Sequence, residues 1–185
     1  PGIKIDKRYS IYKQGIAGDY FLTNPDGTVT TGPVWPGYCH FPDFTNTEVR
    51  DWWAGHVTRL MHYGLNGIWN DMNEPALFNK ADMIQTQRTL DDDVRMGFEG
   101  KGGGFAEGHN LYGMLMSEAT MEGVRQSNDK RPFVLTRSTY SGGQKYAAVW
   151  TGDNVATWEH LRIANYQCQN LAMSGFSFAG SDIGG

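Results

Sequence analysis

Helical segments and short apolar segments alternate along most of this chain, and that alternation limits the folds open to it. Apolar residues recur at helical spacing over residues 45–63, 111–126 and 156–173. Apolar runs typical of strands lie between or after these helices, at residues 65–70, 132–136, 146–150 and 175–180. This order predicts a parallel sheet flanked by helices. One link conflicts with the prediction: residues 137–145 are short for a parallel crossover, which usually takes about a dozen residues or more.

The first predicted helix carries a signal at each end. Thr45 and Glu48 have the spacing of a capping box, and Gly64 is placed to end the helix. Before it, the first 44 residues are rich in loops, with a turn at residues 25–27 that joins short strands. After the strand at 65–70, residues 79–109 are polar and rich in glycine, and we predict a long loop insertion there. The acidic run at residues 91–93 inside it is predicted to be solvated.

Each predicted strand is followed by a charged residue. Asp71 follows the first strand, Arg137 the second, Asp153 the third and Asp182 the fourth. In a parallel α/β array the carboxyl ends of the strands lie on one face, and active sites are built there. We therefore expect three acids and one arginine to converge on a common opening.

Composition excludes several classes of partner. The 185 residues carry a net charge of −4 and no basic run, which argues against a nucleic-acid partner. No apolar stretch approaches the roughly 20 residues that a membrane helix needs, so we expect no membrane association. The two cysteines, Cys39 and Cys168, form no CxxC pair and are predicted to be plain thiols.

Two carboxylates on different strand ends suit the cleavage of a glycosidic bond. One acid attacks the anomeric carbon and the other protonates the leaving oxygen, with about 5–5.5 Å between them in retaining enzymes. Asp71 and Asp153 could face each other in this way, whereas Asp71 and Glu74 lie on one short segment. Arg137 and Asp182 could bond sugar hydroxyls. Apolar walls could come from the aromatic residues Trp35, Trp69, Trp150 and Phe178.

Structural roles compete with these chemical ones. Glu74 could bond backbone amides as the chain leaves its strand, and Asp153 could make an Asx turn or cap a helix. A divalent-metal hydrolase built on Asp71, Glu74 and Asp182 is a further alternative. The five histidines show no HxH or HExxH spacing, so we predict no metal site.

Several blocks of the sequence, in order, resemble glycoside hydrolase family 31, the α-glucosidase family. The stretch GIWNDMNEP is similar to the nucleophile signature of that family. The other similar blocks are VWPG at 34–37, FPDFTN at 41–46, RSTYSGGQKYAAVWTGDN at 137–154 and GFSFAGSDIGG at 175–185.

The resemblance implies a partial (β/α)8 TIM barrel, with about strands 4–7 and the loop that follows strand 3. Residues 1–185 would form part of a single catalytic barrel, and the short link at 137–145 would be a reduced βα unit. The remainder of the same polypeptide would supply the other strands and accessory β domains. The family's substrate-binding aspartate would precede Pro1, and a histidine and an aromatic residue of the site would follow Gly185. We expect a native polypeptide several times longer, and neither folding nor turnover from residues 1–185 alone.

By position, Asp71 corresponds to the family's nucleophile and Asp153 to its acid/base. The other residues that match the wall of the −1 sugar subsite are Arg137, Trp150 and Asp182, with Trp69 and Met72 beside the nucleophile and Trp35 in a loop of variable length. The implied activity is that of a retaining, exo-acting α-glucosidase on oligosaccharides or glycosides, without a cofactor. An α-xylosidase or α-transglucosylase of the same family and a non-catalytic carbohydrate-binding module remain alternatives.

Overall fold

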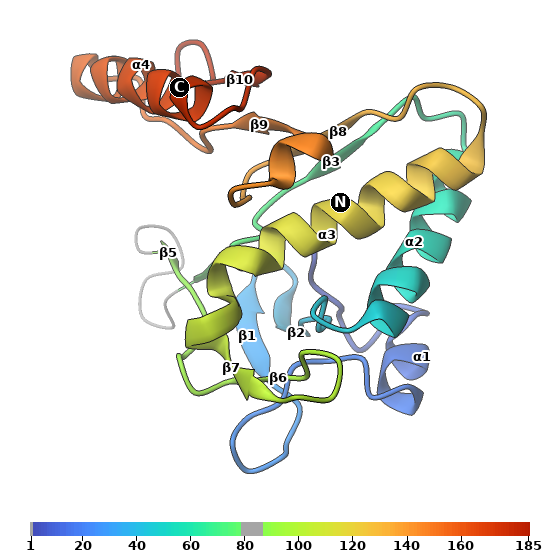
Figure 1. Cartoon of the computed structure of the whole chain (residues 1–185). Helices are drawn as coiled ribbons and strands as arrows, with labels where there is room; N and C mark the ends of the chain where they lie inside the picture. The colour runs from blue at the N-terminus through green and yellow to red at the C-terminus, as the bar shows by residue number, and fades with distance from the viewer. Residues whose placement is uncertain (1, 79–86) are drawn as a thin grey trace.

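Four parallel strands form the central sheet of the computed structural model, which describes residues 2–78 and 87–185. The strands are β3 (Ile68–Asn70), β8 (Val134–Thr136), β9 (Ala148–Trp150) and β10 (Ala179–Gly180), and they lie in the order β10-β9-β8-β3 (Figure 1). Each strand pairs with its neighbour in parallel. The predicted parallel sheet is therefore confirmed, with strands shorter than the apolar runs that predicted them.

Helix α3 (Phe105–Ser127) lies against one face of the sheet, and α2 (Thr47–Met61) packs alongside α3 (Figure 1). Side chains at alternate positions of β3 and β8 point toward them and are buried: Ile68, Asn70, Val134 and Thr136. Trp69 points to the opposite face and is exposed. Helix α4 (Trp158–Met173) lies at the other end of the sheet, beside β10.

The short link between β8 and β9 is a reduced crossover. A single turn of 3-10 helix, η1 (Gly143–Lys145), stands where a full helix would otherwise connect two parallel strands. Tyr146 N and Ala147 N both donate to the carbonyl of Gly143, which returns the chain to the sheet at once. The conflict between link length and parallel pairing is thus resolved in favour of the parallel sheet.

The predicted capping box of α2 is wrong. The residue at the N-cap is Asn46, and no side chain caps the helix there. Thr45 Oγ1 instead donates to Asp43 Oδ1 at 2.6 Å and accepts from the amide of Phe98 at 2.9 Å. The Thr45 hydroxyl, which the local pattern predicted to cap the helix, therefore binds a loop fifty-three positions away instead. At the other end, Gly64 has φ +85° and its amide donates to Met61 O, as expected for a residue that ends a helix.

The glycine-rich stretch at 79–109 contains more regular structure than predicted, although residues 79–86 lie outside the described part. Strand β5 (Gln87–Arg88) pairs with β4 (Leu77–Phe78), and β6 (Arg95–Met96) pairs with β7 (Gly103–Gly104), both antiparallel. Helix α3 begins at Phe105 rather than at 111, because Phe105 is fully buried and its amide donates to Val94 O. The acidic run at 91–93 is exposed, as predicted.

The N-terminal part packs beside the end of β3. It contains α1 (Tyr12–Ala17) and the antiparallel pair β1 (Thr31–Val34) and β2 (Gly37–His40). Gly2 makes a parallel bridge with Asp71, and Ile5 makes an antiparallel bridge with His40. The first residues of the chain therefore run alongside the segment that leaves β3.

Gly123 allows the close approach of α3 to α2. A Cβ at this position would lie 2.5 Å from Ala54 O and 2.6 Å from Val57 Cβ. We expect Gly123→Ala to destabilise the protein by about 1–3 kcal/mol, because the two helix backbones would have to separate. Gly55→Ala is the matched control, because Gly55 is an exposed position of α2 with no atom within 4 Å. Alanine there should stabilise by up to about 1 kcal/mol. Urea unfolding of the full-length protein measures both, and equal effects would contradict the packing argument.

Candidate active site

The backbone ladder between β3 and β8 continues past the strands and brings their charged residues together. Arg137 N donates to Asn70 O at 3.1 Å, so Arg137 lies beside the point where the chain reaches Asp71. On the other side of the sheet, Thr151 N donates to Gly180 O at 3.0 Å, which holds the segment leading to Asp153. The convergence of Asp71, Arg137 and Asp153 at the carboxyl ends of their strands therefore has a direct cause in the register of the sheet, whereas Asp182 does not join them.

Arg137 joins Asp71 and Asp153. Its Nη1 lies 3.3 Å from Asp71 Oδ1 and 3.3 Å from Asp153 Oδ2. These two oxygens therefore cannot be further apart than twice 3.3 Å, whereas the residues are far apart in the sequence. The carboxyl groups of retaining glycosidases stand about 5–5.5 Å apart, which this arrangement allows.

Glu74 pairs with the same guanidinium through Arg137 Nε. The sequence-based alternative, in which Glu74 bonds backbone amides, is therefore replaced by an ion pair. Its second oxygen, Oε2, is buried and has no hydrogen-bond partner among the residues that the structure describes. Glu74 thus orients the arginine and leaves Nη1 directed at the two aspartates.

The guanidinium of Arg137 is a fixed positive charge. Its side chain is only 6% exposed. Burial by itself lowers the pKa of Arg137, but the hydrogen bond that Arg137 donates to Glu74 and the charges of Glu74, Asp71 and Asp153 outweigh burial and raise that pKa above its usual value. A buried cation surrounded by three carboxylates stays charged at every pH at which the protein is folded.

The segment after β3 is held in one shape by Asn73. Its Nδ2 donates to Thr136 Oγ1 at 2.9 Å, and its Oδ1 accepts from the amide of Ser138 at 3.1 Å. Met72, next to it, has φ +55°, a left-handed conformation that costs a non-glycine residue about 1–2 kcal/mol. The Met72 amide donates to Asp71 Oδ1 at 2.8 Å, so the strained turn also orients the acid.

The predicted aromatic wall divides into two groups. Trp69 and Trp150 meet edge to face with ring centroids 5.4 Å apart, on the sheet face that carries Arg137. Trp35 packs instead against Phe78, 4.6 Å away, and no described contact joins it to the charged residues. Phe178 meets Phe133 at 6.0 Å. Trp150 also lines a cavity together with Glu74 and Arg137, so the Trp69–Trp150 pair lies beside the ion-pair network.

Asp182 lies apart from the ion-pair network. It lines a pocket of about 440 Å³ between the C-terminal residues and the start of α4, together with Asn154 and Trp158. Asn154 Nδ2 donates to the backbone carbonyl of Asp182 at 3.4 Å, which ties this segment to the neighbour of Asp153. Asp153 itself does not cap α4, because the N-cap is Thr157, whose side chain accepts from the amide of His160.

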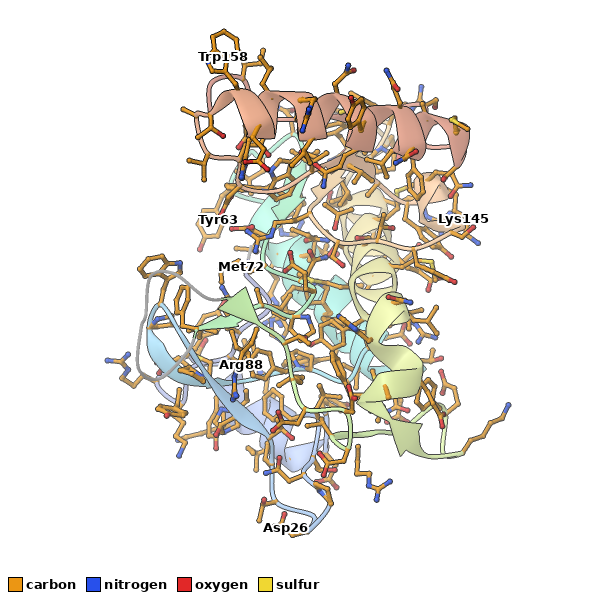
Figure 2. All side chains as sticks on the ribbon, turned by 90° about the vertical axis from the view of Figure 1, so that its left-hand side faces the viewer. Asp26, Tyr63, Met72, Arg88, Lys145 and Trp158 are labelled. Carbon is orange, nitrogen blue, oxygen red and sulfur yellow. The ribbon has the colours of Figure 1, made fainter. Side chains whose placement is uncertain are left out.

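Lys4 is a member of the site that the sequence did not indicate. Its Nζ donates to Met72 Sδ at 2.8 Å, and Figure 2 shows Met72 between α4, at the top of the view, and the β1–β2 pair below. A single lysine in a loop-rich segment gives no pattern from which this position could be inferred. Its partner lies sixty-eight positions away.

Two features are absent from the described residues. Residues 2–78 and 87–185 contain no group of three or more His, Cys, Asp or Glu side chains placed to hold a metal ion. Across those same ranges, no helix has the length and apolar character needed to cross a membrane.

Comparisons with known proteins identify the family of this chain. The family model described as the TIM-barrel domain of glycosyl hydrolases family 31 matches residues 1–185. Over the whole of this chain, the sequence is 48% identical to alpha-glucosidase 2 of Bacillus thermoamyloliquefaciens. The matched region is 23% of the length of that protein. The chain is 40% identical to neutral alpha-glucosidase C of Homo sapiens, of which it spans 20%. A crystal structure of the glucosidase II alpha subunit superposes with a TM-score of 0.85 at 32% identity, over all of this chain and 20% of that one. The chain therefore belongs to glycosyl hydrolase family 31, and its four parallel strands form part of that family's TIM barrel.

Proposed function

We propose that this chain carries the two catalytic acids of a retaining, exo-acting α-glucosidase. The observation that supports this most directly is the single nitrogen, Arg137 Nη1, that lies 3.3 Å from an oxygen of Asp71 and 3.3 Å from an oxygen of Asp153. Two carboxylates at that spacing suit double displacement at an anomeric carbon. The names of the similar proteins support glucose as the sugar.

The two acids have different roles in this proposal. Asp71 attacks C1 as a carboxylate and forms a glycosyl ester, while Asp153 donates a proton to the leaving oxygen. Asp153 then takes a proton from the incoming water, whose oxygen attacks C1 and returns the electron pair to Asp71. The difference in exposure suits these roles: the Asp71 side chain is 33% exposed beside Arg137, whereas that of Asp153 is 72% exposed.

The remaining side chains would bind and orient the sugar. Trp69 and Trp150 offer apolar surface next to the acids, and Arg137 neutralises part of their charge. Met72 lies beside the nucleophile. We further propose that Asp182 and Trp35 contact substrate from the loops that carry them, and that no cofactor or metal takes part. Other parts of the full-length polypeptide complete the pocket.

A substrate panel on the full-length protein tests the proposal. We expect release of 4-nitrophenol from the α-glucoside, with less from the α-xyloside and α-galactoside, and no loss of rate in a chelator. Proton NMR during hydrolysis should show the α-anomer of glucose first, because two displacements retain configuration. The β-anomer appearing first would contradict the double displacement.

The same panel separates the alternatives. A preference for the α-xyloside would indicate an α-xylosidase, and transfer of glucose to an added sugar in place of water would indicate an α-transglucosylase. Sugar binding without release of 4-nitrophenol would indicate a carbohydrate-binding module. Loss of rate in a chelator would indicate a metal-dependent hydrolase.

A further inference from the structure

Lys4 lies against the segment that carries the proposed nucleophile. The parallel bridge between Gly2 and Asp71 brings the start of the chain alongside the end of β3. From there the Lys4 side chain reaches Met72, whose sulfur accepts a hydrogen bond from Nζ at 2.8 Å. Lys4 is half-buried, whereas Lys7, three positions on, is exposed.

The turn at Met72 connects Lys4 with the carboxylate of Asp71. Met72 has a left-handed backbone, and its amide donates to Asp71 Oδ1 at 2.8 Å. A lysine bonded to the Met72 side chain therefore restrains the residue that orients the acid. Met72 is itself buried, so the thioether has little room to move away.

The charge balance of the site favours a second cation near Asp71. Asp71, Glu74 and Asp153 surround Arg137, which neutralises one negative charge among three. Burial lowers the pKa of Lys4, but the charge of Asp71 acts in the opposite direction and favours the ammonium form. The positive charge of Arg137 lowers the pKa of Lys4, as burial does. The ammonium group thus interacts with both ends of the Asp71–Arg137 pair.

We propose that Lys4 is a positioning residue of the active site, which places a positive charge beside Asp71 and holds the Asp71–Met72 turn in its reactive shape. This inference rests on the proposed function of Asp71 as the nucleophile. Lys4 acts through Asp71 and Met72 and does not itself react with the sugar.

The pH dependence of kcat/KM tests this role, because its acid limb reports the ionisation of the essential carboxylate in the free enzyme. The variants are Lys4→Met and Lys4→Gln, which remove the charge, Lys4→Arg, which keeps it, and Lys7→Met as the exposed control. All are made in the full-length protein and assayed with 4-nitrophenyl α-glucoside. The other charged groups that face Asp71, namely Glu74, Arg137 and Asp153, stay the same in every variant.

We expect the acid limb of both neutral variants to move to higher pH by about half a unit or more, because a carboxylate that loses a nearby cation binds its proton more readily. The limbs of Lys4→Arg and Lys7→Met should coincide with that of the parent protein. Two neutral substitutions are used so that a folding defect in one does not decide the result, and unfolding temperatures identify such a defect.

Two different results would overturn two different statements. If the parent protein hydrolyses the glucoside and neither neutral variant shifts the acid limb, Lys4 has no electrostatic role and the inference is wrong, even if both variants are slower at every pH. If the parent protein releases no 4-nitrophenol, the proposed function itself is wrong.

Discussion

Asp71→Ala should lower kcat/KM for every α-glucoside by about 10⁴-fold or more, since losses of this size follow when a nucleophile is removed from a site whose groups act as a unit. The loss should not depend on the leaving group, because the covalent intermediate cannot form with any substrate. Steady-state rates with maltose, 4-nitrophenyl α-glucoside and α-glucosyl fluoride measure it. Asp91→Ala is the matched control, because Asp91 is an exposed acid of a loop, and this variant should keep its activity.

A small external nucleophile gives a second measurement on the Asp71→Ala variant. Azide fits into the space that the carboxylate leaves and would displace fluoride from α-glucosyl fluoride on the opposite face of C1. The expected product is β-glucosyl azide, which forms only if Asp71 attacks from that face. Formation of the α-azide, or full activity without azide, would contradict the role proposed for Asp71.

Asp153→Ala should divide substrates by their leaving groups. With maltose, whose departing sugar hydroxyl needs a proton, we expect kcat/KM to fall by about 10²–10⁴-fold, the usual contribution of a general acid. With α-glucosyl fluoride, which needs little protonation, the formation of the glycosyl-enzyme should be nearly unchanged. Pre-steady-state release of fluoride separates this first step from the slower second one, in which Asp153 acts as the base.

The control for Asp153 is its conservative variant. Asp153→Asn keeps the size of the side chain and cannot transfer the proton, so it should show the same division between substrates as Asp153→Ala. Equal losses on maltose and on α-glucosyl fluoride in both variants would contradict an acid/base role and indicate that Asp153 only orients Arg137.

The sheet and the placement of its charged residues could be predicted from the sequence because both depend on local pattern. Apolar runs between helical periodicities predicted four parallel strands, and the position of Asp71 and Arg137 after those runs placed them at one edge. The register of the sheet then brings Arg137 beside Asn70. Parallel pairing makes this neighbourhood possible, but no local sequence pattern predicts it.

What the sequence did not predict depends on partners far along the chain. Glu74 pairs with Arg137 sixty-three positions away, and Thr45 binds a loop amide fifty-three positions away instead of capping its own helix. Lys4 reaches Met72 across an even longer separation. A polar side chain can form any of several hydrogen bonds, and the packing of the folded chain determines which one forms. Helix α3 likewise begins earlier than predicted, because the burial of Phe105 outweighs the glycines around it.

The reduced crossover between β8 and β9 has a consequence for how this chain can vary in length. Arg137 and Asp153 are only sixteen positions apart, and a single turn of 3-10 helix separates their strands. An inserted residue in that link has no helix to absorb it, so it would shift the cation and the proposed proton donor relative to each other. The segment from 137 to 153 should therefore tolerate substitutions much better than insertions or deletions.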